Sequence, residues 1–339
     1  MIKVLSTVQR QRFEKFNVDF PQNWEINYLD PAYTDAELIE ACKDADFLFI
    51  MSTHTVSTRV IRACPRLKLI HVEGVGFDKV DIQAAKELGI PVCNNRAVND
   101  GAVAEHTIGL MLAGLRRTAS SDAQIKAIGY PACQQEFMAA GQRELQSTHV
   151  GLIGMGAIGR EVARRLKNWN CSISYYDAFR PAPGIEKELG VEYLELQELL
   201  QRCDIISLHV PVLPSTYHML STKEFEMMKP SALVVNTARG EIIDPMALAD
   251  ALENGKIYGA ALDTLYPEPA PVYHPLLNLS PQGRKRLTLT PHVGGTTDEA
   301  FTRMLKGAIA NMHRVLDGIQ PIHVVNGVEI QRESAVSNG

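Results

Sequence analysis

The sequence predicts an α/β protein with two domains, each built on a parallel β-sheet covered by helices. Three observations lead to this prediction. The chain of 339 residues is too long for one ordinary hydrophobic core. Short apolar runs alternate with polar, helix-like stretches, which is typical of parallel sheets. One such run, residues 149–153, leads directly into a pattern of three closely spaced glycines at positions 154, 156 and 159.

The first 99 residues contain four short apolar runs that we interpret as strands: residues 2–5, 46–51, 67–72 and 91–93. The third run is followed by the glycine-rich turn Glu73-Gly74-Val75-Gly76-Phe77-Asp78. Backbone N–H groups of such a turn can bind an anion. A plain strand-to-helix turn explains the glycines equally well.

A long apolar helix is predicted next. Asn99 and Asp100 are capping residues, and residues 101–117 carry apolar side chains on nearly every face. A helix that is apolar all round is buried, either between domains or between subunits. We expect the helix to continue to about Ile128, followed by a loop containing Gly129 and Pro131.

The three glycines match the fingerprint of a dinucleotide-binding turn. Gly154 allows a tight turn, Gly156 lets a diphosphate approach the backbone, and Gly159 lets the following helix pack on its strand. The helix N-terminus suits a pyrophosphate, and Asp177 stands where an acidic residue binds the ribose. The alternative is that the glycines only serve a tight strand-to-helix turn.

The region after Asp177 continues the same sheet, with predicted strands at residues 204–210, 232–236, 257–262 and 287–290. Ser221 and Glu224 form a capping box, Asp244 caps a helix that starts with Pro245, and Gly255 marks its end. These alternations predict a Rossmann-type, doubly wound sheet with a ligand crevice at the carboxyl ends of its strands.

The last predicted helix begins at a second capping box, Thr296-Thr297-Asp298-Glu299, and runs to about Leu316. We expect it to return to the first domain. The predicted domains are therefore residues 1–99 with 297–339, a flavodoxin-like α/β domain, and residues 100–296, the dinucleotide-binding domain. The chain would then cross between the two domains twice, near residues 99–101 and 293–296, and these crossings would form a hinge over a cleft.

Composition excludes several classes of partner. The net charge of −5, with mixed signs along the chain, argues against nucleic acid. The six cysteines are too far apart for a zinc site or a redox dithiol, and His106 and most other histidines fit no ligand spacing, so we expect no metal. No apolar run reaches the ~18 residues of a membrane span. A cytoplasmic protein is expected.

Three charged or titratable residues follow predicted strands beside the crevice: Arg239, Glu268 and His292. Reduction of a ketone by hydride transfer needs a proton donor at the oxygen, and imidazole serves well near neutral pH. Glu268 would hold the ring in place. Arg239 could bind a carboxylate with two parallel hydrogen bonds. Taken singly, each residue also fits a surface ion pair, a solvated turn or a core histidine.

These residues lie in motifs that resemble the NAD-dependent D-2-hydroxyacid dehydrogenase family over about residues 45 to 327. The motifs here are GVGFDKVD, VAEHTIGLML, GMGAIG, HVPVLPST, VVNTARGEIID, ALDTLYPEP, TPHVGG and VVNG. Their order and intervals match throughout. The resemblance implies catalysis by Arg239, His292 and Glu268, a homodimer formed through residues 102–115, and NAD(H) as the cofactor.

The resemblance also implies a set of binding residues. Asp263 would hold the nicotinamide carboxamide, Asp177 the adenosine ribose, and Val103 the nicotinamide, while the amides of Val75 and Gly76 would meet the substrate carboxylate together with Arg239 and His292. The other predicted cofactor contacts are Gly154, Gly156, Ala157, Ile158, Gly159, Val210, Pro211, Thr216, Thr237, Ala238, Arg239, His292 and Gly294. His209, before Val210, is expected to shape its loop.

The substrate is left open by the sequence. Residues 50–55 lack the Arg-Ser pair of many family members, the loop at 269–290 looks long and carries Arg284-Lys285-Arg286, and residues 130–141 contain no tryptophan. We expect a small 2-oxo acid or D-2-hydroxy acid such as glyoxylate or hydroxypyruvate. The alternatives are D-3-phosphoglycerate dehydrogenation, less plausibly formate or phosphite oxidation, and an NADH-sensing protein similar to transcriptional corepressors.

Overall fold

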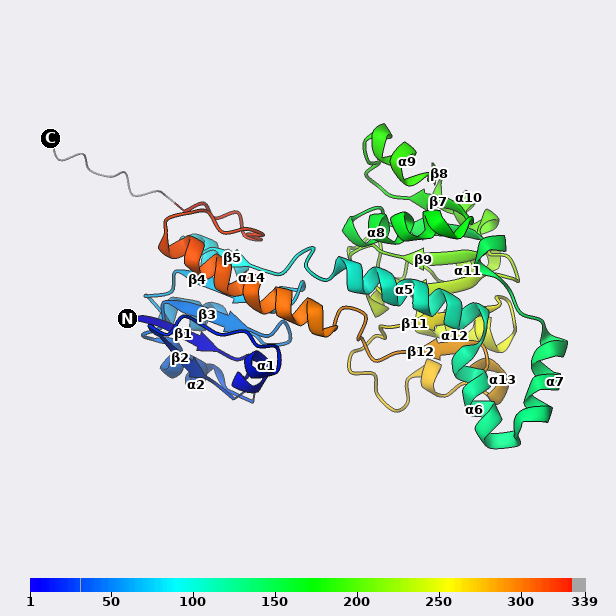
Figure 1. Ribbon diagram of the computed structural model, residues 1–339, viewed down its shortest axis with the longest axis horizontal. Coiled ribbons are helices and arrows are strands. Elements are labelled where there is room, and N and C mark those ends of the chain that lie inside the picture. Colours follow the sequence, from blue (N-terminus) through cyan, green and yellow to red (C-terminus); the bar gives the residue numbers. More distant parts are fainter. Residues whose placement is uncertain (31, 331–339) are drawn as a thin grey trace. The chain divides into compact units, whose positions relative to one another are not determined.

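The computed structural model describes residues 1–30 and 32–330. The chain forms two compact units: Met1–Asn99 with Thr296–Gly339, and Asp100–Gly295 (Figure 1). We refer to them as unit 1 and unit 2. Each contains one parallel sheet, which confirms the predicted α/β class. None of the described helices is long and apolar enough to cross a membrane.

Unit 1 contains a five-stranded parallel sheet in the order β2-β1-β3-β4-β5, the strand order of flavodoxin-like folds. Its strands are β1 (Ile2–Ser6), β2 (Trp24–Tyr28), β3 (Phe47–Ile50), β4 (Leu69–Val72) and β5 (Val92–Cys93). Its helices are α1 (Arg10–Lys15), α2 (Asp35–Cys42), α3 (Thr58–Ala63), α4 (Ile82–Glu87) and α14 (Asp298–Leu316).

Helices cover both faces of this sheet because successive side chains of a strand point to opposite faces. On β3, Phe47 and Phe49 pack with α1 and α14, whereas Leu48 and Ile50 pack with α2, α3 and α4. All four side chains are fully buried. The continuous apolar run FLFI is therefore explained by burial on both faces.

Unit 2 contains a seven-stranded parallel sheet in the order β12-β11-β10-β9-β6-β7-β8. Its strands are β6 (His149–Ile153), β7 (Ser172–Tyr176), β8 (Glu192–Tyr193), β9 (Ile205–Leu208), β10 (Leu233–Asn236), β11 (Gly259–Leu262) and β12 (Leu287–Leu289). Its helices are α5 (Asp100–Leu115), α6 (Thr118–Ile128), α7 (Tyr130–Ala140), α8 (Ala157–Leu166), α9 (Pro183–Leu189), α10 (Leu196–Arg202), α11 (Thr222–Met227), α12 (Pro245–Glu253) and α13 (Pro281–Arg284), with 3₁₀ turns at Leu145–Ser147, Lys167–Trp169, Gly240–Ile242 and Pro275–Leu277.

The strand order of unit 2 is that of a doubly wound nucleotide-binding sheet with one added strand. The order reverses between β6 and β9, which are hydrogen-bonded neighbours. Helices α5, α8 and α9 cover one face, and α10, α11 and α12 cover the other (Figure 1). Ligands of such sheets bind at the carboxyl ends of the strands where the order reverses.

The structure corrects several predicted elements. Residues 130–140 form helix α7 instead of the expected loop, because Pro131 occupies the first turn, where a missing N–H costs nothing. The predicted continuous helix breaks at Arg117, whose φ is 49°. The N-cap of α14 is Thr297, which accepts from the N–H of Ala300, so the expected capping box of Thr296 and Glu299 is wrong. The capping box at Ser221 is confirmed.

Candidate active site

The glycine turn after β6 is tightly packed at Gly154 and Gly159 and open at Gly156, the position where the sequence predicts that a diphosphate approaches. Gly154 has a φ of 107°, and a Cβ there would come within 2.5 Å of the carbonyl oxygen of His209. A Cβ on Gly159 would overlap the carbonyl of Gly154. Gly156, the N-cap of α8, faces open space. Ala157 and Ile158 begin this helix, so their N–H groups lie where a diphosphate would bind.

Asp177 follows β7 and is bonded to this turn. Its carboxylate accepts hydrogen bonds from the N–H of Met155 at 2.6 Å and of Phe179 at 2.9 Å. Arg180, a cation three residues later, forms an ion pair with Glu186 at 2.8 Å and lies 4.3 Å from the ring centre of Tyr193. The carboxylate therefore faces the glycine turn, while Arg180 is engaged on α9 and β8.

The segment after β9 forms a compact turn beside Gly154. The hydroxyl of Thr216 donates to the carbonyl of Pro211 at 2.6 Å and accepts from the N–H of Leu213 at 2.8 Å. Val210 lies 3.0 Å from the position that a Cβ on Gly154 would take. His209 bonds to Ser207 at 2.9 Å, and burial lowers its pKa to about 4. The uncharged ring thus belongs to the loop structure.

Arg239 stands in a turn that is fixed by the buried side chain of Asn236. The Asn236 amide donates to the carbonyl of Arg239 at 2.8 Å and accepts from the N–H of Ala238 at 2.9 Å. The guanidinium donates to the carbonyl of Ala238 at 2.7 Å and has no ion-pair partner among the described residues. A Cβ on Gly240 would come within 2.5 Å of the Tyr266 nitrogen, so this turn packs on the segment that leads to Glu268.

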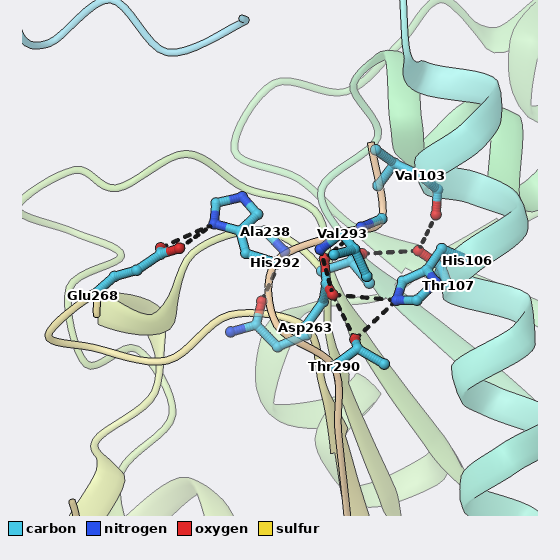
Figure 2. Close-up of polar contacts among 12 residues, drawn as sticks. Val103, His106, Thr107, Ala238, Asp263, Glu268, Thr290, His292 and Val293 are labelled. Carbon is cyan, nitrogen blue, oxygen red and sulfur yellow. Dashed lines mark hydrogen bonds and ion pairs between the residues drawn. The ribbon is translucent and has the colours of Figure 1, made fainter. Parts of the chain in front are cut away.

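His292 and Glu268 are hydrogen-bonded. Nδ1 of His292 lies 2.7 Å and 2.9 Å from the two carboxylate oxygens of Glu268 (Figure 2). An ionised carboxylate can only accept, so Nδ1 carries a proton and Nε2 remains for a substrate. The two side chains are 40% and 52% exposed, respectively. The pair is thus open to a ligand.

Asp263, at the end of β11, holds the turn that carries His292. Its backbone carbonyl accepts from the N–H of His292 at 2.7 Å, and its carboxylate accepts from the N–H of Val293 at 3.0 Å and of Gly294 at 2.8 Å. Burial raises the pKa of Asp263, but hydrogen bonds to the carboxylate, led by that from His106, outweigh burial and hold the pKa well below its usual range. The carboxylate is therefore ionised within the protein.

Helix α5 is attached to the end of β10 through two threonines. The hydroxyl of Thr107 donates to the carbonyl of Val103 at 2.7 Å, so the hydroxyl of Thr237 is the donor in the 2.8 Å bond between the two threonines (Figure 2). Val103 is buried. The predicted cofactor contacts Val103 and Thr237 therefore belong to one connected group in unit 2.

The predicted anion-binding turn of unit 1 is held by two asparagines. The amide of Asn94 donates to the carbonyl of Val75, and that of Asn95 donates to the carbonyl of Glu73, both at 2.6 Å. The N–H groups of Val75 and Gly76 donate to no described backbone carbonyl. This arrangement keeps the carbonyls engaged and leaves two N–H groups for an anion.

Sequence reasoning missed two residues of interest. His106 contacts Asp263 and Thr290, although its spacing suggests no ligand role. The available signal was a titratable side chain within an otherwise apolar, buried helix. The second residue is Arg96, an exposed cation that directly follows Asn94 and Asn95 of the anion-binding turn. It lies outside residues 50–56, the segment in which the sequence predicts the substrate wall. Among the described residues, no group of three or more His, Cys, Asp or Glu side chains could hold a metal ion.

Comparison with known proteins identifies the family. A family model described as the NAD-binding domain of D-isomer specific 2-hydroxyacid dehydrogenases matches residues 108–294. A protein named glyoxylate reductase from Korarchaeum cryptofilum is 36% identical over 289 residues, which cover 85% of each chain. The chain belongs to the D-2-hydroxyacid dehydrogenase family. Its predicted activity class is thereby confirmed: it is an NAD-dependent oxidoreductase that interconverts 2-oxo acids and D-2-hydroxy acids.

Other relatives of this dehydrogenase carry different substrate names. A hydroxypyruvate reductase from Thermotoga maritima is 37% identical over 79% of this chain and 84% of its own length. A D-3-phosphoglycerate dehydrogenase from Methanocaldococcus jannaschii is 38% identical over 88% of this chain but only 55% of its own length. The crystal structure of the TT0316 protein from Thermus thermophilus matches with a TM-score of 0.83 and 31% identity, covering 96% of this chain and all of that one.

Proposed function

We propose that this dehydrogenase acts on small, unphosphorylated 2-oxo acids such as glyoxylate or hydroxypyruvate, with Arg239, His292 and Glu268 as its catalytic residues. The observation that carries this proposal is the His292–Glu268 pair, which leaves Nε2 free, on a unit whose Arg239 has no ion-pair partner among the described residues. A proton donor and a carboxylate-binding group are what reduction of a 2-oxo acid requires.

In this proposal each residue has a separate task. NADH, when bound, supplies the hydride. His292 donates a proton from Nε2 to the carbonyl oxygen, and Glu268 stabilises the charged ring before the transfer. Arg239 binds the substrate carboxylate with two parallel hydrogen bonds. The N–H groups of Val75 and Gly76 are proposed to bind that carboxylate as well.

The binding roles given above to Asp177, Asp263 and Gly294 are part of the same proposal. Asp177 would accept hydrogen bonds from the ribose hydroxyls and repel a 2′-phosphate. Arg180, the nearby cation that could attract this phosphate, is already paired with Glu186. This pairing supports a preference for NAD(H) over NADP(H).

The charges near the predicted substrate wall support a substrate with one anionic group. The wall, residues 50–56, contains no Lys or Arg. Arg59 is exposed, and Arg62 forms an ion pair with Glu87 at 3.3 Å. A second, phosphate-sized anion would need cationic partners of its own, since desolvating an unpaired charge is costly.

The basic residues of the 269–290 segment are engaged within unit 2. This segment, which the sequence suggests is a long loop, contains helix α13 and a 3₁₀ turn. Lys285 pairs with Glu136 at 2.5 Å, and Arg284 donates to the carbonyl of Leu279 at 2.8 Å. Arg286 donates to the carbonyl of Tyr258 at 3.3 Å. These contacts argue against a substrate role for the three cations.

The substrate proposal is tested by measuring kcat/KM for glyoxylate, hydroxypyruvate and 3-phosphohydroxypyruvate with NADH. We expect kcat/KM of the better unphosphorylated acid to be at least about tenfold higher than that of 3-phosphohydroxypyruvate. A tenfold difference corresponds to about 1.4 kcal/mol, which one phosphate charge without a cationic partner would readily cost. The Arg96→Ala variant is the control, because Arg96 is the exposed cation nearest in sequence to Asn94 and Asn95. A preference for the phosphorylated acid that Arg96→Ala abolishes would contradict the proposal and favour D-3-phosphoglycerate dehydrogenation.

A homodimer is also part of the proposal. The helix through which the resemblance implies the dimer, α5, is largely buried within unit 2. We therefore propose an interface on α6 and α7, whose exposed apolar side chains are Ile125, Ile128, Tyr130 and Met138. Apolar patches of this kind are covered by a partner in many assemblies. The location in the cytoplasm stays a prediction from the sequence.

A further inference from the structure

His106 points from α5 toward the turn that carries His292. Its Nε2 lies 2.9 Å from the hydroxyl of Thr290 and 3.2 Å from Oδ1 of Asp263 (Figure 2). The hydroxyl of Thr290 also donates to Oδ1 of Asp263, at 2.5 Å. Helix α5 and the residue after β12 therefore meet at one oxygen of the Asp263 carboxylate.

The protonation state of this group follows from its donors. Thr290 uses its only hydrogen on the carboxylate, and an ionised carboxylate accepts only. Nε2 of His106 must therefore carry a proton, because its lone pair would otherwise face the negative charge of Asp263. His106 is thus a donor to the group, and it stabilises the ionised form of a side chain that is only 3% exposed.

The same carboxylate holds the backbone of the turn that carries His292. His292 has a left-handed backbone, with a φ of 55°, a conformation that is uncommon for residues with a side chain. The N–H groups of Val293 and Gly294 donate to this carboxylate, and the N–H of His292 donates to the backbone carbonyl of Asp263. They hold the His292 backbone in this conformation.

His106 also contacts this turn directly. A Cβ added to Gly294 would lie 3.1 Å from Cδ2 of His106 and 3.0 Å from Oδ2 of Asp263. The turn is therefore packed against the imidazole as well as bonded to the carboxylate. Loss of the ring would remove both a donor to Asp263 and the surface on which Gly294 rests.

We propose that His106 is a positioning residue, which acts through Asp263 and Thr290 to hold the turn of His292 in its reactive arrangement. This inference rests on the proposed role of His292 as the proton donor. His106 itself touches neither Glu268 nor His292 among the described contacts. His106 affects the rate because proton transfer is slow when the His292 ring is displaced from the substrate oxygen.

The test compares His106→Leu and His106→Gln with the wild-type enzyme. Leucine removes the donor, whereas the amide nitrogen of glutamine reaches about as far as Nε2. The matched control is His149→Leu, which removes a similar histidine–hydroxyl bond, 2.7 Å to Ser174, at the opposite end of the sheet. Four quantities are measured: kcat, KM for the 2-oxo acid, the Kd of NADH, and amide hydrogen exchange of the peptide covering residues 290–295.

We expect His106→Leu to lower kcat about tenfold to a hundredfold, the range for a displaced catalytic group. The Kd of NADH should change by a smaller factor than kcat, because Asp263 and Gly294 are only two of its proposed contacts, and the peptide at 290–295 should exchange faster. His106→Gln should recover most of kcat, and His149→Leu should change neither kcat nor that exchange. The recovery by glutamine distinguishes a lost hydrogen bond from a general loss of stability.

Two results would overturn the inference without touching the proposed function. One is a wild-type kcat in His106→Leu, and the other is a glutamine variant no better than the leucine variant. If the wild-type enzyme reduced no 2-oxo acid, the proposed function would fail instead. The exchange measurement needs neither substrate nor NADH and would still decide whether His106 holds the turn.

Discussion

His292 combines two constraints that limit what can replace it. Its backbone is left-handed, a conformation that Asn, Asp and His tolerate better than other residues with side chains. Its Nδ1 is bonded to Glu268, which leaves Nε2 as the proposed acid. Asparagine is therefore the replacement that removes the acid and keeps the backbone.

We predict that His292→Asn lowers kcat by about 10² to 10⁴, the usual worth of a positioned general acid. The Kd of NADH, measured by fluorescence titration, should stay near the wild-type value. The control is His323→Asn, because His323 is an exposed histidine of unit 1 with a φ of 60°. Wild-type turnover in His292→Asn would disprove the assignment of the acid.

At the scale of elements, the end of β4 carries a buried ion pair. The side chain of Glu73 is 7% exposed, and both its oxygens accept from Nη1 of Arg12, the shorter bond being 2.8 Å. Burial raises the pKa of Glu73, and the nearby Arg12 opposes that rise. Arg12 comes from the short helix α1 and also lies over the ring of Phe301 on α14. One side chain thus connects two helices to the strand end.

Replacing Arg12 by methionine keeps most of this packing but leaves the Glu73 carboxylate buried without its partner. We predict a loss of about 2 kcal/mol in the free energy of unfolding at pH 7, measured with urea. The loss should shrink toward pH 5, because a carboxyl with a raised pKa destabilises the fold less when protonated.

The control for that prediction is the double variant Arg12→Met with Glu73→Gln, which removes the unpaired charge. It should recover more than half of the lost stability. Equal stabilities of the single and double variants at pH 7 would mean that the ion pair contributes only through packing.

Elements with strong local signals could be predicted from the sequence. The run FLFI and the glycines at 154, 156 and 159 each fix a strand or a turn through residues that lie next to each other. Strand β2 lacks such a signal, since WEINY mixes apolar and polar residues at the edge of its sheet. Helix α7 was misjudged because Gly129 and Pro131 are typical of loops, although proline also suits a first helical turn.

The candidate site divides in the same way. Arg239, Glu268 and His292 follow strands, so their common end of the sheet could be predicted. The role of His106 could not, because it depends on contacts with Asp263 and Thr290, which are far away in sequence. Spacing along one helix carries no information about such partners.

At the scale of the whole molecule, each unit contains a histidine whose pKa is lowered by desolvation. In unit 1, burial lowers the pKa of His71 to about 4; its Nδ1 bonds to the carbonyl of Val72 and its Nε2 to Asn311. In unit 2, burial lowers that of His209 to about 4. Histidine in an unfolded chain titrates near pH 6.5, so between about pH 6.5 and 4 the unfolded state binds more protons. Stability must fall as the pH falls through this range.

We predict that the free energy of unfolding of the wild-type protein falls by about 2 kcal/mol between pH 7 and pH 5 because of His71 alone. The His71→Gln variant, which cannot bind the proton, should lose less over the same interval in urea titrations. His313→Gln, at an exposed position on α14, serves as the control and should keep the wild-type pH dependence. Parallel pH profiles for wild type and His71→Gln would exclude His71 as the source.

The return of α14 to unit 1 has a consequence during protein synthesis. Val4, Phe47, Phe49 and Leu69 need Leu305, Ala308 and Met312 of α14 to complete their side of the core. Roughly 200 residues separate β5 from α14, which take about 10 to 40 s to translate. Unit 2 is one continuous segment and leaves the ribosome whole during that interval. Newly made chains therefore carry an aromatic sheet face that only α1 covers until the last helix emerges, and this exposed apolar surface is of the kind that chaperones bind.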